Sequence, residues 1–144
     1  MVKEFYTMRT DLLADKITFT NAIDLGHSIV RLRNDGVVQV NFGDDTEIDT
    51  KESIEIVEAI GVLTERKKAL ILNIAGKNTT ATSGARNHSA SEDGAKYTIA
   101  DAFVTKSLAQ KLLGNFYMNF HKPIVPTRMF EDIEKATLWL KSQL

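Results

Sequence analysis

The chain has 144 residues, of which 43% are hydrophobic and 26% are charged, and its formal net charge is −1. This length is usual for one domain, and the apolar content supports a core and is too high for a disordered chain. The absence of cysteine excludes disulfides and thiolate catalysis, and the interleaved charges lack the basic stripe of a nucleic-acid-binding protein.

The first 27 residues have the least regular pattern, and we interpret them as an arm with room for a short strand near residues 17–20. They lack the apolar stretch of a signal peptide, and no run in the chain approaches the ~20 apolar residues of a membrane helix. We therefore expect a cytoplasmic protein without an integral membrane segment. Phe5, Tyr6 and Leu12 are suited to docking on the same chain or on a neighbour, which leaves a homodimer open.

A β-hairpin is predicted at residues 28–33 and 37–42, because apolar and polar side chains alternate on both sides of an Asn-Asp-Gly turn. A helix is predicted to begin after Asp49. This carboxylate can cap the first amides, and Glu52 can reach back in a capping box. Apolar residues then recur at helical spacing behind Glu52.

Residues 69–74 form a near-continuous apolar run, which predicts a central strand covered on both faces. Residues 76–94 contain no large apolar side chain, and a helix of small residues is predicted from about Ser83. The rest of the chain predicts a strand at 97–104, a helix with two apolar ridges between Leu108 and Phe120, an edge strand at 124–129 and an amphipathic helix at 130–144.

This order of elements predicts an α/β fold. An N-terminal antiparallel hairpin is followed by parallel strands in one mixed sheet, and about four helices are layered on it. We place the arm at residues 1–27 and the domain at residues 28–144.

No complete catalytic motif is present. Gly76 and Lys77 resemble the end of a phosphate-binding loop, but Ile71 replaces the leading glycine and Asn78 replaces the required serine or threonine. A nucleophile elbow at residues 82–84 lacks its leading glycine. We expect no catalytic residues and therefore not an enzyme.

His27, His88 and His121 are scattered along the chain, so a metal site would have to be assembled from distant segments. We expect these histidines to be exposed to solvent, and we expect no metal and no cofactor. Asp101 interrupts an otherwise apolar strand. If Asp101 is buried, it needs partners or a raised pKa, whereas on the solvent side of an edge region it needs neither. We expect Asp101 to face solvent.

The segment from Thr79 to Ser91 joins the carboxyl end of a buried parallel strand to a helix, which is where open α/β sheets usually bind ligands or partners. Its hydroxyls and amides can hold an anion or accept a phosphoryl group. Alternatively, the segment is a solvated loop whose serine and threonine side chains cap the helix.

This junction resembles that of the STAS fold of anti-sigma-factor antagonists, and later segments resemble the bacterial STAS/SEC14-like domain family. The resemblance covers roughly residues 28–144 and is carried by residues 69–74 (ALILNI), 82–86 (TSGAR), 113–117 (LGNFY), 122–123 (KP), 126–130 (PTRMF) and 136–140 (ATLWL).

The resemblance implies a STAS-like domain in which a hydroxyl at the junction is phosphorylated by a partner kinase. Thr82, with Ser83 beside it, is at that position, and Ala81 replaces the family's aspartate. The candidate residues for binding a partner or ligand are Arg86, Asn115, Tyr117 and Arg128.

We therefore expect a non-enzymatic binding or regulatory domain that recognises an unidentified protein partner at Thr82–Arg86. The alternative is a carrier of a small apolar or anionic, lipid-like ligand. Such a carrier would use the space between this junction and the helix that contains Phe116 and Tyr117.

Overall fold

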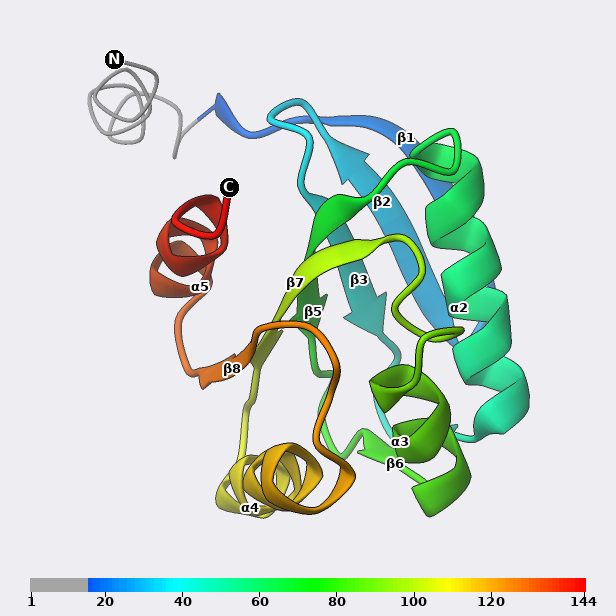
Figure 1. Cartoon of the computed structure of the whole chain (residues 1–144), viewed down its shortest axis with the longest axis vertical. Helices are drawn as coiled ribbons and strands as arrows, with labels where there is room; N and C mark the ends of the chain where they lie inside the picture. The colour runs from blue at the N-terminus through cyan, green and yellow to red at the C-terminus, as the bar shows by residue number, and fades with distance from the viewer. Residues whose placement is uncertain (1–15) are drawn as a thin grey trace.

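The computed structural model describes residues 16–144 and places helices on both faces of a six-stranded sheet (Figure 1). The strand order is β1-β2-β3-β5-β7-β8. The pairs β1–β2 and β2–β3 are antiparallel, and the pairs β3–β5, β5–β7 and β7–β8 are parallel. This arrangement confirms the predicted α/β class. The strands are β1 (Phe19–Asp24), β2 (Ser28–Arg33), β3 (Val38–Phe42), β5 (Ala69–Ile74), β7 (Thr98–Val104) and β8 (Thr127–Phe130).

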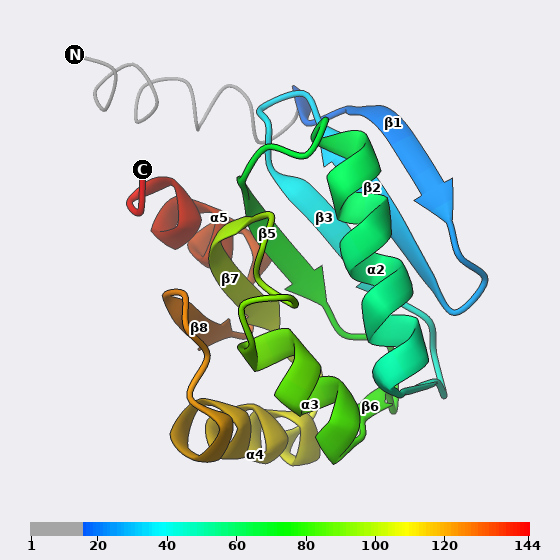
Figure 2. The ribbon, with the colours of Figure 1, turned by 45° about the vertical axis from the view of Figure 1, so that its right-hand side comes forward.

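Two helices, α2 and α3, cover one face of the sheet, and α5 covers the other (Figure 2). The helix α4 runs into a π-helical turn, η2, and lies beside α3 at one end of the sheet. The helical segments are α2 (Thr50–Leu63), α3 (Ser83–Ala90), α4 (Leu108–Phe116), η2 (Tyr117–His121) and α5 (Ile133–Lys141).

The predicted hairpin is present as β2 and β3, and Gly36 supplies the positive φ of 88° that its turn requires. The sheet also extends into the segment interpreted as an arm, because β1 pairs antiparallel with β2 along the outer edge. Phe5, Tyr6 and Leu12 lie outside the described residues. The described helices are all too short or too polar to cross a membrane.

The alternation of side chains along β5 divides the core into two clusters. Leu70 and Leu72 face α5, where they pack with Leu140. Ile71, between them, faces the other side of the sheet and packs with Ile56 and Ile60 of α2. The predicted central strand therefore owes its unbroken apolar run to helices on both faces.

The hairpin is joined to α5 by a buried ionic cluster. Both carboxylate oxygens of Asp35 accept hydrogen bonds from Arg33, at 3.1 and 2.7 Å, and Lys141 Nζ lies 2.8 Å from Asp35 Oδ2. The guanidinium of Arg33 also donates to Thr137 of α5. Burial by itself raises the pKa of Asp35, but the hydrogen bonds from Arg33 and Lys141 outweigh burial and lower it.

The last helix begins later than predicted. Phe130 is still in β8, where it is paired with Val104, and α5 begins only at Ile133. Asp132 is its N-cap and accepts a hydrogen bond from the backbone amide of Lys135 at 3.1 Å. Asp132 therefore caps the helix, and Glu134 adds a negative charge to its first turn.

Candidate functional site

The junction expected to be functional is held by a second, two-stranded parallel sheet of β4 (Glu47–Ile48) and β6 (Thr80–Ala81). The amide of Thr82 continues this ladder by donating to the carbonyl of Ile48 at 2.9 Å. Because β4 leads into α2 and β6 leads into α3, the amino ends of these two helices lie side by side. The predicted capping box of α2 is also present, with Glu52 accepting from the amide of Asp49.

Thr82 is the N-cap of α3, as expected for a threonine that precedes a helix. Its hydroxyl accepts a hydrogen bond from the amide of Ala85 at 3.2 Å and donates to Asp49 Oδ1 at 2.8 Å. The bond from Thr82 is the main reason that the pKa of Asp49 is lowered. Ser83 is exposed to solvent. A carboxylate therefore does face Thr82, but it comes from the start of α2 and not from position 81.

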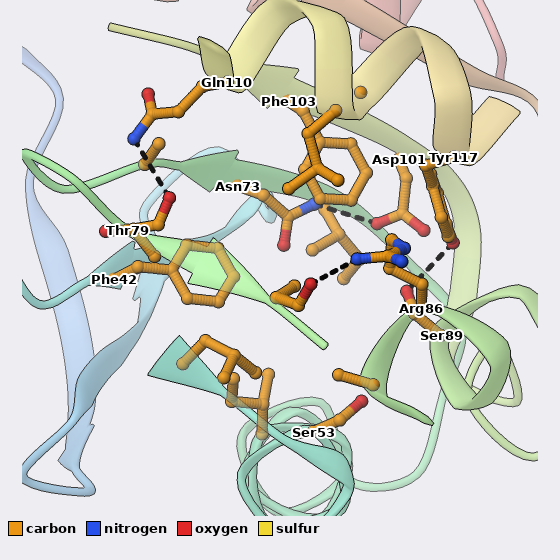
Figure 3. A pocket seen from close by; sticks show the side chains of 18 of the residues that line it. Phe42, Ser53, Asn73, Thr79, Arg86, Ser89, Asp101, Phe103, Gln110 and Tyr117 are labelled. Carbon is orange, nitrogen blue, oxygen red and sulfur yellow. Dashed lines mark hydrogen bonds between the residues drawn. The ribbon is translucent and has the colours of Figure 1, made fainter. Parts of the chain in front are cut away.

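A mostly apolar cavity of about 170 Å³ lies beneath this junction, between the sheet and the helices α2, α3 and α4 (Figure 3). Its apolar wall includes Phe42, Ile56, Ile71, Phe103 and Leu113. The cavity occupies the space between the junction and the Phe116–Tyr117 helix that the ligand-carrier alternative requires.

The cavity wall contains Asp101, and the expectation that this residue faces solvent is wrong. Asp101 is only 8% exposed because β8 pairs on the far side of β7, so β7 is not an edge strand. Asn73 on β5 donates its side-chain amide to Asp101 Oδ1 at 3.0 Å. Burial raises the pKa of Asp101 to about 6, and the bond from Asn73 offsets only part of this effect.

Two of the predicted binding residues, Arg86 and Tyr117, also line the cavity. The hydroxyl of Tyr117 donates to Ser89 Oγ at 3.0 Å, and burial raises the pKa of Tyr117, with a further contribution from the charge of Asp101. Arg86 donates from Nη1 to the carbonyl of Ala81, and its guanidinium lies 5.6 Å from the ring centre of Phe116.

The other two predicted binding residues lie outside the cavity. Asn115 is exposed on α4, and Arg128 is exposed on β8 with its guanidinium 5.3 Å from the ring centre of Phe130. The structure thus brings Arg86 and Tyr117 together and leaves Asn115 and Arg128 on the surface.

The expectation that the histidines are exposed to solvent is wrong, because His27, His88 and His121 are all partly buried. His88 is largely enclosed because it bonds to Ser53 of α2 at 2.7 Å and to Asp93 at 3.0 Å. His27 contacts Glu55 of α2 at 3.3 Å. Within residues 16–144, no three histidine, aspartate or glutamate side chains are grouped closely enough to hold a metal ion.

The helix α4 is anchored to the loop that precedes the junction through Gln110. The Gln110 side-chain amide donates to the carbonyls of Gly76, at 2.8 Å, and Thr79, at 3.2 Å, and its oxygen accepts from the amide of Lys106. Gln110 is buried, so these bonds fix the wall of the cavity that α4 supplies.

Sequence reasoning missed Asn73 and Ser89 as residues of the site. The available signal for Asn73 was its place in an apolar strand predicted to be covered on both faces, where an amide needs a partner. Ser89 lies one helical turn after Arg86, which places both on the same side of α3.

The fold and site define an α/β domain whose sheet and helices line a small, mostly apolar cavity with several polar groups in its wall. A family model described as a domain of unknown function, DUF7793, matches residues 30–144, and the chain belongs to this family. No curated protein and no solved structure matches the chain.

Proposed function

We propose that this protein is a non-enzymatic binding domain that takes up a small ligand in the cavity beneath the Thr82–Arg86 junction. The observation that carries this proposal is the cavity itself. A mostly apolar space of about 170 Å³ with a few convergent polar groups is typical of ligand sites, and a cavity of roughly 150 Å³ is known to hold benzene.

The polar side chains of Tyr117 and Asp101 suit the cavity to holding a ligand. The hydroxyl of Tyr117 is bonded to Ser89, and the raised pKa of Tyr117 keeps that hydroxyl protonated. Asp101 is held by Asn73 on the rigid sheet. These groups can orient a ligand inside the cavity.

A cavity-filling variant tests the proposal. Ala85 is buried on the inner side of α3 and lines the cavity, so Ala85→Leu places an added isopropyl group in the space. Asn87→Leu is the matched control, because Asn87 is exposed on the same helix.

We expect toluene to raise the melting temperature of the wild type and of Asn87→Leu, and to leave Ala85→Leu unchanged. Mass spectrometry of small molecules extracted from the natively purified proteins should show the same pattern for the natural ligand. Equal responses of all three proteins would refute binding in this cavity.

Recognition of a protein partner is a second candidate function, and it is favoured by an exposed apolar ridge beside the junction. Leu112, Phe116 and Phe120 are 59%, 46% and 70% exposed on α4 and η2, and Ser83 is open to solvent nearby. The resemblance to STAS domains, which remains a proposal, supports the same role, with Thr82 and Ser83 as phosphoacceptors.

Affinity capture with wild type, Thr82→Glu and Phe120→Ser tests this second function. We expect a partner that the wild type retains and that both variants lose. Capture of the same proteins by all three baits would count against recognition at this surface.

A further inference from the structure

Asp101 is a buried carboxylate without a cationic partner. It accepts one hydrogen bond, from Asn73, and no lysine, arginine or histidine of the described chain forms an ion pair with it. A buried charge is stable only when it is paired and hydrogen-bonded. Because Asp101 lines the cavity, the missing donor can come from a molecule inside it.

Arg86 has the complementary property, a buried donor without an acceptor. Its Nε is buried and has no hydrogen-bond partner in residues 16–144. The guanidinium is nevertheless held in place, since Nη1 donates to Ala81 and the group lies over the ring of Phe116. A buried, unsatisfied donor of this kind costs free energy unless an acceptor reaches it.

These two groups belong to one polar end of the cavity. Arg86 and Ser89 share a side of α3, Ser89 bonds to Tyr117, and the charge of Asp101 acts on Tyr117. Figure 3 shows these four side chains gathered together, with Phe42 at the opposite end of the pocket. Among residues 16–144, no ion pair joins Asp101 to Arg86, so each can engage a different group of one ligand.

The remaining wall sets the size and character of the rest of the ligand. Phe42, Ile71, Phe103 and Leu113 supply apolar surface, and the volume of about 170 Å³ suits a branched aliphatic group or one aromatic ring. The whole site therefore matches a small molecule with a positive group, a negative group and a short apolar body.

We propose that the cavity binds a zwitterionic apolar amino acid, with its ammonium toward Asp101, its carboxylate toward Arg86 and its side chain among the apolar residues. This inference rests on the proposed ligand-binding function. It adds the chemical class of the ligand.

The test compares amino acids with analogues that lack one charge. L-leucine is measured by calorimetry against 3-methylbutylamine and 4-methylpentanoate, and L-phenylalanine against 2-phenylethylamine and 3-phenylpropanoate. We expect at least one amino acid to bind about tenfold or more tightly than both of its analogues. Each analogue lacks one charged group of the amino acid and therefore cannot make the charge-assisted hydrogen bond of that group.

Two variants assign the contacts. Asp101→Asn should abolish the preference of the amino acid over its acid analogue, and Arg86→Met should abolish the preference over its amine analogue. If neither amino acid exceeds its analogues in the wild type, the inference is overturned, whether or not the variants fold. Toluene binding in that case would leave the cavity proposal intact, whereas failure of toluene as well would remove both.

Discussion

Asn73 and Asp101 face each other across the neighbouring parallel strands β5 and β7, and their side chains are joined by a 3.0 Å hydrogen bond inside the cavity. This bond connects the candidate site to the stability of the fold. The amide donor stabilises the carboxylate, but burial has the larger effect and raises the pKa of Asp101 to about 6. The protein therefore holds a carboxyl group that is poorly stabilised in its charged form.

Asp101→Asn should change how stability depends on pH. Between the unfolded pKa of 3.8 and the folded pKa of about 6, the native carboxyl keeps a proton that the unfolded chain has lost. Stability from Asp101 is therefore fully present below about pH 4 and declines as pH rises through 6, by on the order of 3 kcal/mol. Asparagine does not titrate, so the variant should gain about this amount relative to wild type between about pH 4 and about pH 8.

Urea unfolding of both proteins at these two pH values measures the effect. Arg86 and Tyr117 also line the cavity, but they are present in both proteins and cancel in the comparison. If the difference in unfolding free energy between the two proteins is the same at both pH values, Asp101 is not buried as an isolated carboxyl.

Asp35→Asn should lower the free energy of unfolding substantially, and the contribution of Asp35 should depend on pH in the opposite direction to that of Asp101. Removing the carboxylate leaves Arg33, which is 4% exposed, without its ionic partner and weakens the tie to Lys141 on α5. Loss of one partner of a buried pair costs about 3 kcal/mol. Because the pKa of Asp35 is lowered, its contribution is present above the ordinary value of 3.8 and is lost as pH falls below it.

Chemical denaturation at neutral pH tests the loss of stability, and acid titration of the folded state tests its pH dependence. Glu92→Gln serves as the control, since Glu92 is exposed and should change stability by less than about 0.5 kcal/mol. A variant Asp35→Asn as stable as Glu92→Gln would contradict a structural role for the cluster.

Thr82→Ala should destabilise the domain by about 1 kcal/mol, because the N-cap of α3 is lost together with the bond to Asp49. Thr82→Ser keeps the hydroxyl and should retain most of the stability. Ser83→Ala, at the next and exposed position, should be nearly neutral. Guanidinium unfolding of the three variants decides the matter, and equal losses at both positions would rule out a specific capping role for Thr82.

The features that could be predicted from the sequence depend on neighbouring residues. The turn at Gly36, the capping box between Asp49 and Glu52 and the apolar run of β5 each follow from local spacing, and each is present in the structure. The burial of Asp101 depends instead on β8, which pairs beyond β7 after an intervening helix. Burial set by such distant pairing leaves no periodic signal near residue 101.

The cavity was harder still to predict, because it consists of space that no side chain fills. The same limitation applies to α4. Its two apolar ridges predicted the helix correctly, but nothing in their spacing distinguishes the inward Leu113 from the outward Leu112. Gln110 binds α4 to the loop before the junction, and that contact joins residues more than 30 positions apart.

The exposed ridge of α4 gives the last prediction. Leu112→Ala should cost less than about 0.5 kcal/mol, because Leu112 is 59% exposed, whereas Leu72→Ala should cost about 2–5 kcal/mol, because Leu72 is completely buried between β5 and α5. Urea denaturation of the two variants at several protein concentrations measures both costs. A large cost for Leu112→Ala that grows with protein concentration would show that a second copy covers this ridge in solution, since the stability of a dimer depends on concentration and that of a monomer does not.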